Sequence, residues 1–324
     1  MYLIIHLISY TYKYVIPKDH TINSYLTLII NQLIYNDLFN QLTMPNGSLL
    51  KMNARFIYVI FLSTCWFLTP ANAQEIEAIE TSWGHIYTIE ENYPNSTMDG
   101  YNLYVPKTTN RSKPLPVIVF LQGGLGVGGD VDRILNWALP KMLKEPEAYD
   151  NELETLVLQT FIVIMPHIAN GQFYENERAM RAILKEVAST YSVDSRRIYL
   201  TGLSRGGHGT WGLGSRMNDV FAAIAPICGS GRGITGYESL SQMPIWISHN
   251  TGDNVVQYRT TRLTVDRLEA ANGFPFHHSR SLSEVKYKDF DRVFTSTPND
   301  AHDAWTEFYN SPKLYNWFLK YKKE

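Results

Sequence analysis

The sequence predicts an α/β fold with a doubly wound, mostly parallel sheet and helices on both of its faces. Continuous apolar runs are typical of strands that are buried on both sides, and such runs occur at 116–121, 161–165, 198–200, 222–227 and 245–248. Segments with helical character alternate with them, at 131–144, 175–190, 205–217, 260–271 and 302–320. This alternation predicts βαβ units, and the ligands of such sheets bind at the carboxyl ends of the strands.

Two further strands are predicted before the first of these runs. They cover residues 85–90 and 101–105, and the turn-rich segment 93–100 joins them. No segment of the chain is long enough to form a large lid. We therefore expect residues 74–324 to form a single α/β domain.

The segment 52–73 has the pattern of a secretory signal peptide. Basic residues (Lys51 and Arg55) come first, an apolar stretch from Phe56 to Leu68 follows, and the small residues of 71–73 form a cleavage site. The apolar stretch is too short to span a bilayer, so we expect cleavage near Ala73, a mature chain without stable membrane insertion, and a secreted or periplasmic location. A lipid-attachment box at Cys65 is the weaker alternative.

The position of this segment inside the chain indicates an upstream extension. Secretion requires a signal peptide at the N-terminus, so we interpret Met52 as the start and residues 1–51 as an extension of the reading frame. The competing interpretation is one long membrane-active leader. Asn, Gln and His residues interrupt the apolar stretches of such a leader, which argues against it.

Charge and cysteine content exclude some classes of function. The net charge is −2, with no run of like charges, which argues against a nucleic-acid partner. If Cys65 is removed with the signal peptide, Cys228 stands alone and no intramolecular disulfide can form. Cys228 ends an apolar run, and we expect it to be a buried core residue.

The segment 198–211, IYLTGLSRGGHGTW, predicts a nucleophile elbow. It has a strand, a tight turn with Ser204 at its tip, and a helix. Gly202 and Gly206 lack the side chains that would keep strand and helix apart. The alternative is a glycine-rich turn with a solvated serine.

A glycine-rich segment at 122–129 follows the strand 116–121 and predicts an oxyanion hole. Backbone N–H groups must meet the negative charge that develops on an attacked carbonyl, and glycines let the backbone approach closely. We assign this role to the N–H of Arg205 and to that of Gly124 or Leu125. A phosphate-binding loop is disfavoured because the Gly-Lys-Ser/Thr ending is absent, and a flexible surface loop is the remaining alternative.

A serine nucleophile needs a base, and the base needs an orienting carboxylate. Asp253 follows the strand 245–248, and His302 lies in a polar loop before an aromatic-rich helix, which are the places of the acid and the base on a fold that carries a nucleophile elbow of this kind. A capping aspartate and a surface histidine are the alternatives, and His208 is the second choice of base. His277 and His278 lie in a predicted loop without the ligand spacing of a metal site, so we expect no metal there. Nothing else in the sequence implies a metal or an organic cofactor.

With these residues placed, the chain resembles the α/β-hydrolases, and more narrowly the secreted bacterial esterases of the polyhydroxybutyrate-depolymerase, feruloyl-esterase and predicted-peptidase (prolyl-oligopeptidase-like) type. The resemblance rests on residues 197–207, on the Thr-Gly-Asp-Asn-Val-Val of 251–256 and on the His-Asp-Ala-Trp of 302–305. It implies that Ser204 is the nucleophile, His302 the base and then acid, and Asp253 the orienting carboxylate. Gln122 stands where such enzymes commonly have histidine, which affects the geometry of the oxyanion loop.

The resemblance implies a serine esterase that acts on small-molecule or polysaccharide esters with short acyl or phenolic groups. Trp137, His167 and Trp305 are the predicted substrate contacts, because each lies near a predicted strand end. A prolyl-oligopeptidase-like peptidase is the rival enzyme, and a carbohydrate-binding protein on a degenerate hydrolase fold is the alternative without catalysis. The sequence leaves the oligomeric state open.

Overall fold

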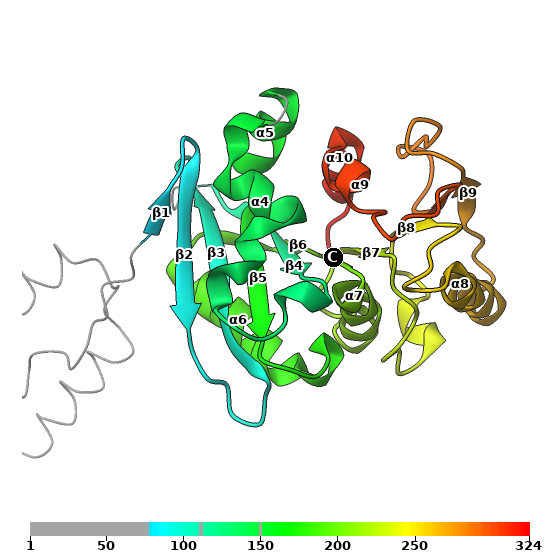
Figure 1. The fold of residues 1–324 in the computed structure, drawn as a ribbon, viewed down its shortest axis with the longest axis horizontal. Coiled ribbons are helices and arrows are strands. Elements are labelled where there is room, and N and C mark those ends of the chain that lie inside the picture. Colours follow the sequence, from blue (N-terminus) through cyan, green and yellow to red (C-terminus); the bar gives the residue numbers. More distant parts are fainter. Residues whose placement is uncertain (1–77, 110–112, 149–150) are drawn as a thin grey trace, which may run out of the picture. The chain divides into compact units, whose positions relative to one another are not determined.

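A computed structural model describes residues 78–109, 113–148 and 151–324 (Figure 1). The predicted extension 1–51, the predicted signal peptide 52–73 and the predicted first mature residue, Gln74, lie outside the described residues. Within the described ranges, no helix combines the length and the apolar character needed to cross a membrane.

The centre of the fold is a ten-stranded sheet with the order β1-β2-β3-β5-β4-β6-β7-β8-β10-β9. Strands β1 to β3 and β5 pair antiparallel in that order, and the pairs from β5 through β4 to β9 are parallel. The strands are β1 (Ala78–Glu80), β2 (Gly84–Glu90), β3 (Met98–Pro106), β4 (Leu115–Leu121), β5 (Ile162–Ile168), β6 (Val193–Leu203), β7 (Ala223–Ile227), β8 (Ile245–Asn250), β9 (His277–Ser279) and β10 (Arg292–Thr297).

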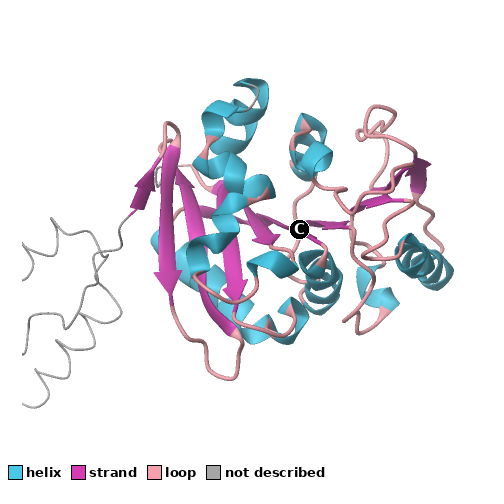
Figure 2. Ribbon diagram, viewed as in Figure 1, coloured by secondary structure: helices cyan, strands magenta, loops and turns pink. Residues whose placement is uncertain are grey.

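Helices cover both faces of the sheet (Figure 2). One face packs against η2 (Val131–Asn136), α4 (Ala138–Lys144), α5 (Asn151–Leu158), α9 (Thr306–Tyr309) and α10 (Pro312–Phe318). The other face packs against α6 (Glu177–Thr190), α7 (Arg205–Arg216) and α8 (Tyr258–Asn272). Short 3₁₀ turns complete the connections: η1 (Gly124–Gly126), η3 (Pro146–Ala148), η4 (Phe173–Glu175) and η5 (Tyr237–Leu240). The predicted doubly wound, mostly parallel sheet is confirmed.

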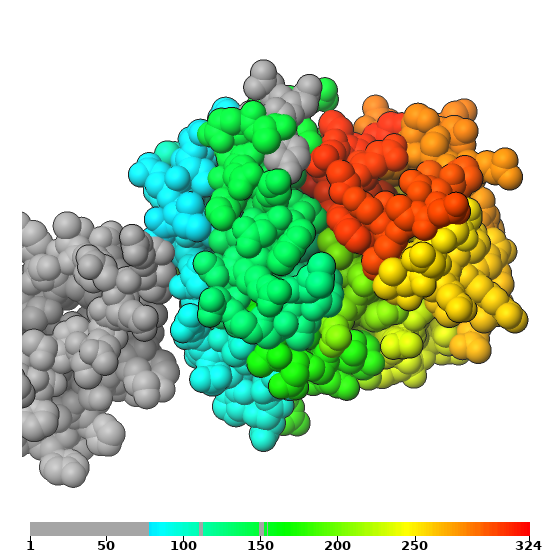
Figure 3. All heavy atoms as spheres, viewed as in Figure 1, coloured from blue at the N-terminus to red at the C-terminus, as the bar shows by residue number. Residues whose placement is uncertain are grey.

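Two hydrophobic cores explain why the central strands are continuously apolar. In β4, Ile118 and Phe120 contribute to the core under α4 and α10, whereas Val117, Val119 and Leu121 contribute to the core under α6 and α7. Successive side chains point to opposite faces of a strand, so every position of β4 is buried. Figure 3 shows the C-terminal residues, in red, between the green segment that contains α4 and α5 and the orange segment that precedes β10.

The structure corrects several predicted elements. Strands β1, β9 and β10 and helix α5 were not predicted, and β9 places His277 and His278 in a strand instead of a loop. Strand β6 begins at Val193, although the polar residues of 193–197 predict a turn there. Its first residues are partly exposed, which explains their polar character.

Two predicted helices are interrupted, each beside a proline. The predicted helix 131–144 divides at Trp137, whose backbone is extended, because the ring of Pro140 in α4 would clash with the carbonyl of residue 136 in a continuous helix. The predicted helix 302–320 is a loop followed by α9 and α10. Helix α10 starts anew at Pro312, where the hydroxyl of Ser311 accepts a hydrogen bond from the N–H of Lys313.

No inserted lid subdomain is present in the described part of the chain. Its strands are connected by short helices, 3₁₀ turns and loops. The carboxyl ends of β4, β6, β7, β8 and β10 therefore meet at one edge of the sheet without a large cover.

The turn between β6 and α7 is packed too closely for side chains at its glycines. A Cβ atom on Gly202 would lie 2.7 Å from the carbonyl oxygens of Leu121 and Gly206. A Cβ atom on Gly206 would overlap the carbonyl oxygen of Leu121, and one on Gly207 would overlap that of Ile227. Helix α7 therefore starts directly against the ends of β4 and β7, and Ser204 is held at the tip between them.

This packing predicts that Gly206→Ala destabilises the fold. We expect the free energy of unfolding to fall by at least about 2 kcal/mol, because backbone atoms cannot give way to the methyl group as a flexible side chain would. Urea titration followed by circular dichroism measures the loss. Gly124→Ala is the matched control: its Cβ would lie 3.7 Å from Arg205 Nε, and we expect a change within about 0.5 kcal/mol. Equal stability of the two variants would contradict the account.

Candidate active site

Ser204 occupies a strained position at the start of helix α7. Its backbone angles are φ 54° and ψ −112°, in a region that residues with a side chain rarely adopt. The N–H of Ser204 donates to the carbonyl of Ile227 at 2.9 Å, and its own carbonyl accepts from the N–H of His208 at 3.0 Å. Such strain persists only where the surrounding structure enforces it, as the close approach of β4, β7 and α7 does here.

Asp253 is in the turn that follows β8, and its side chain has no exposed surface. Its Oδ1 accepts hydrogen bonds from the N–H groups of Val255 and Val256, at 2.9 and 3.0 Å. Its Oδ2 lies 2.7 Å from Nδ1 of His302. Burial alone would raise the pKa of Asp253, but the hydrogen bonds from His302, Val256 and Val255 outweigh burial and hold the pKa below its usual value. The carboxylate is therefore ionised near neutral pH.

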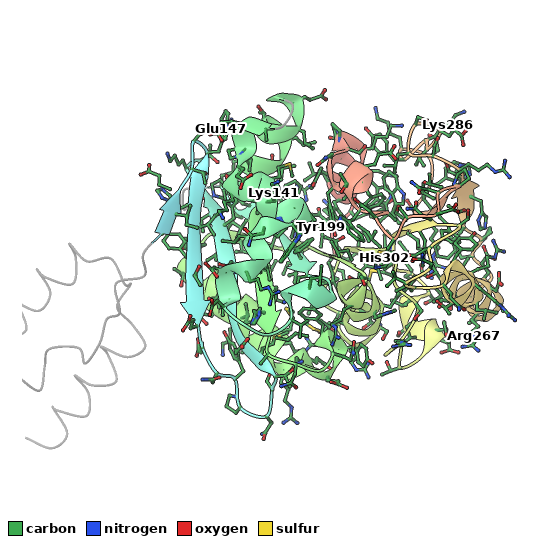
Figure 4. The ribbon with its side chains drawn as sticks, viewed as in Figure 1. Lys141, Glu147, Tyr199, Arg267, Lys286 and His302 are labelled. Carbon is green, nitrogen blue, oxygen red and sulfur yellow. The ribbon has the colours of Figure 1, made fainter. Side chains whose placement is uncertain are left out.

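His302 lies in the loop between β10 and α9 (Figure 4). Strand β10 pairs in parallel with β8 in a register that sets Thr297 beside Asn250, so the loops after both strands start side by side. The amide of Asn250 donates to the carbonyls of Ala301 and Asp303, at 2.9 and 3.0 Å, and so holds the loop on each side of His302. With Nδ1 on Asp253, Nε2 is the nitrogen left to exchange a proton with a substrate or a nucleophile.

Cys228 lies close to Asp253 and His302. It follows β7, has φ 39° and is fully buried. Its Sγ is within 4.8 Å of ligand atoms of Asp253 and His302, and the residue before it, Ile227, accepts the hydrogen bond from the N–H of Ser204. The thiol thus marks the point where the turn of Ser204 and the loops of Asp253 and His302 converge.

The same convergence could in principle hold a metal ion, since Cys228, Asp253 and His302 are all possible ligands. Burial raises the pKa of the Cys228 thiol well above its usual value, which keeps the thiol uncharged, whereas metal ligation requires the thiolate. Asp253 and His302 are already hydrogen-bonded to each other. The arrangement therefore fits proton transfer better than metal binding.

The residues predicted for the oxyanion hole lie around the start of α7. The backbone N–H of Arg205 is the first of the helix and has no partner within it. The N–H groups of Gly124 and Leu125, at the start of η1, likewise make no hydrogen bond to a described residue. Gln122 supports this loop, because its buried amide donates to the carbonyl of Gly126 at 3.0 Å.

The three predicted substrate contacts differ in exposure. Trp137 is 38% exposed, and Trp305 is partly exposed and packs its ring edge-on against His302, with 5.3 Å between centroids. His167 is fully buried in β5, and its Nδ1 lies 2.6 Å from Oδ1 of Asp99. A side chain without exposed surface cannot contact substrate, so the structure corrects the expectation for His167.

His208 is unsuited to act as the base. It is buried, and its Nδ1 accepts a hydrogen bond from the N–H of Ser230 at 2.9 Å. Burial lowers its pKa, and no carboxylate is hydrogen-bonded to it within the described residues.

His249 also lies at this site, although it is not among the predicted site residues. Its Nε2 lies 3.2 Å from Oδ2 of Asp253, the oxygen that also faces His302. A histidine four residues before the acid, at the end of a buried strand, is the signal that could have indicated it.

No protein-family model matches this chain. The bifunctional acetylxylan esterase/xylanase XynS20E of Neocallimastix patriciarum is 29% identical over 106 residues, which are 31% of this chain and 16% of that protein. Less than two thirds of the length of that relative is therefore matched.

Solved structures give broader coverage. A thermostable esterase superposes with a TM-score of 0.58 at 24% identity, over 74% of this chain and 63% of that chain, again less than two thirds of its length. The feruloyl esterase module of Clostridium thermocellum, in complex with sinapinate, has a TM-score of 0.56 at 16% identity and covers 77% of this chain and 92% of its own. The acetyl xylan esterase of Aspergillus awamori has a TM-score of 0.51 at 13% identity, over 72% of this chain and 99% of that one. Together with the observed strand order, these likenesses show that the chain has the α/β-hydrolase fold.

Proposed function

We propose that this protein is a serine hydrolase that cleaves carboxylic esters through an acyl-enzyme. Ser204 is the nucleophile, His302 the general base and then acid, and Asp253 the carboxylate that orients His302. The observation that carries the proposal is the 2.7 Å contact between the buried carboxylate of Asp253 and Nδ1 of His302, at the sheet edge where Ser204 is held in a strained turn. The esterases among the structural neighbours support ester hydrolysis.

In the first half of the reaction, Oγ of Ser204 attacks the ester carbonyl while Nε2 of His302 takes the hydroxyl proton. The alcohol then leaves with that proton, and the acyl group stays on Oγ. Water repeats the sequence and releases the acid. The Ser204 hydroxyl makes no hydrogen bond to a described residue, so it is free to turn toward His302 when substrate binds.

Asp253 contributes by fixing the tautomer and orientation of His302. An ionised carboxylate next to Nδ1 keeps the proton on that nitrogen and leaves the lone pair on Nε2 for Ser204. Its negative charge also stabilises the imidazolium that forms during the reaction. Because hydrogen bonds keep the pKa of Asp253 low, this charge is present across the neutral pH range.

The oxyanion is stabilised by backbone N–H groups. The amide of Arg205 and that of Gly124 or Leu125 have no partner among the described residues and are available for the charge that develops on the carbonyl oxygen. Removing one donor from such a site typically costs roughly 100- to 1000-fold in kcat.

We infer that the substrate is a small or polysaccharide-linked ester with a short acyl or phenolic group. Exposed apolar side chains stand next to two parts of the proposed site, Leu125 on η1 and Val255 beside Asp253, and Trp137 is exposed after η2. Apolar surface of this kind suits an aromatic or short aliphatic acyl group, and the neighbours that are feruloyl and acetyl xylan esterases support that class. The signal-peptide pattern of 52–73 supports a secreted or periplasmic enzyme.

The first test replaces the nucleophile. We expect Ser204→Ala to abolish turnover of p-nitrophenyl acetate and methyl ferulate while thermal unfolding stays near that of the wild type, because the side chain carries the reaction and not the packing. A peptide anilide in the same assays distinguishes an esterase from a peptidase.

The matched control for this test is Ser230→Ala. Ser230 Oγ lies 3.2 Å from Nδ1 of His208, so this serine and histidine form a competing pair. We expect Ser230→Ala to retain turnover. Loss of activity in Ser230→Ala with retention in Ser204→Ala would refute the proposed nucleophile.

The second test concerns the orienting carboxylate. We expect Asp253→Asn to lower kcat by about 10⁴-fold, the cost observed when an amide favours the wrong histidine tautomer in a serine protease. KM should change little, because Asp253 is buried and does not contact substrate. Steady-state kinetics on p-nitrophenyl acetate measure both constants, and a kcat within tenfold of the wild type would show that His302 does not depend on Asp253.

A further inference from the structure

We propose that His249 is a positioning residue of the active site, which holds the carboxylate of Asp253 so that Asp253 can orient His302. This inference rests on the proposed function. His249 is fully buried at the end of β8, four residues before Asp253, and is too deep to touch substrate.

His249 contacts Oδ2 of Asp253, the same carboxylate oxygen that faces His302. Oδ2 of Asp253 faces two histidine nitrogens, Nδ1 of His302 at 2.7 Å and Nε2 of His249 at 3.2 Å. Oδ1 is occupied by the N–H groups of Val255 and Val256. His249 is therefore the second group, besides His302, that lies against Oδ2.

The neighbours of His249 determine which nitrogen carries its proton. Nε2 lies 2.9 Å from the carbonyl oxygen of Val256 as well as 3.2 Å from the Asp253 carboxylate, and both of these groups only accept hydrogen bonds. Nε2 must therefore carry the hydrogen. Burial lowers the pKa of His249, so the ring is neutral and Nδ1 is left as an acceptor.

Thr261 supplies the partner that Nδ1 requires. Its hydroxyl lies 2.8 Å from Nδ1 and 3.0 Å from the carbonyl oxygen of Gly229. That carbonyl can accept two hydrogen bonds and also has one from Nε1 of Trp211 at 2.9 Å, so it keeps a donor when the single hydroxyl proton of Thr261 turns to Nδ1 of His249. A donor at Nδ1 keeps the hydrogen on Nε2, where it faces Asp253.

These contacts connect the acid to the rest of the site. Trp211 belongs to α7, the helix that begins directly after Ser204, and Thr261 belongs to α8. The ring of Tyr258, also on α8, packs at 90° against that of His249, with 5.8 Å between centroids. The orientation of His249 is thus held by two residues of α8, and Trp211 of α7 shares the Gly229 carbonyl with Thr261.

The test compares two amide variants of similar size. The amide nitrogen of glutamine reaches close to the place of Nε2, whereas that of asparagine reaches only to the place of Nδ1. On p-nitrophenyl acetate we expect His249→Gln to stay within about threefold of the wild type in kcat. We expect His249→Asn and His249→Leu to lose roughly 10- to 100-fold, the usual effect of a lost hydrogen bond to a charged group, with KM nearly unchanged.

A double-mutant cycle separates positioning from a general role in folding. In an Asp253→Ala background, His249→Leu should have no further effect on kcat, because the group through which it acts is gone. An equal loss in both backgrounds, or equal kcat for His249→Leu and the wild type, would overturn the inference. If His249→Leu fails to fold, the comparison of His249→Gln with His249→Asn decides, and equal loss in these two also overturns it.

Failure of the inference can be told apart from failure of the proposed function. If Ser204→Ala and Asp253→Asn lose turnover while the His249 variants retain it, only the role of His249 is wrong. If Ser204→Ala retains turnover, the proposed function itself is wrong and His249 has no triad to position.

Discussion

The carboxylate of Asp253 is a buried charge, and the local structure is arranged to supply it with hydrogen-bond donors. A buried carboxylate without partners would cost several kcal/mol or lose its charge by taking up a proton. Its donors come from its own turn (Val255 and Val256) and from the loop after β10 (His302), and Nε2 of His249, at the end of β8, lies 3.2 Å from Oδ2. The need to keep this one group ionised thus ties together the segments that a serine hydrolase requires.

The sheet register makes this convergence possible. Strands β8 and β10 are far apart in sequence but pair in parallel, so that Asn250 and Thr297 end side by side and their loops leave the same edge. Asn250 then holds the loop around His302 through two backbone carbonyls. On the other side of this edge, the packing of α7 on β4 and β7 holds Ser204 in its strained turn. Backbone pairing, close packing and the side chain of Asn250 therefore place the residues of the proposed triad.

The sequence was informative where one local pattern had one physical cause. Strands such as β4 were predictable because burial on both faces demands an unbroken apolar run. Strand β10 was missed because it begins with Arg292 and ends in polar residues; the guanidinium is buried and donates to the carbonyls of Leu240 and Ser241, a partnership that only the folded chain creates. The division of the segment 302–320 was present in the sequence, as Ser311 followed by Pro312.

In the candidate site, too, the sequence did not predict the contacts between residues that are far apart in the chain. The positions of Ser204 and Asp253 after strands, and of His302 in a loop before a helix, could be inferred from the chain order. The burial of His167 could not, because its partner Asp99 comes from β3, which pairs with β5 across a long separation in sequence. Likewise, the tie between His249 and Asp253 depends on Thr261 and Gly229, which belong to other segments of the chain.

The most direct test of the central claim is covalent trapping of the nucleophile. The purified protein is treated with a fluorophosphonate, digested, and the modified peptide is identified by mass spectrometry. The account predicts one adduct, on Ser204, which forms much more slowly in the Asp253→Asn variant. The absence of an adduct, or an adduct on Ser230 in place of Ser204, would contradict the proposed active site.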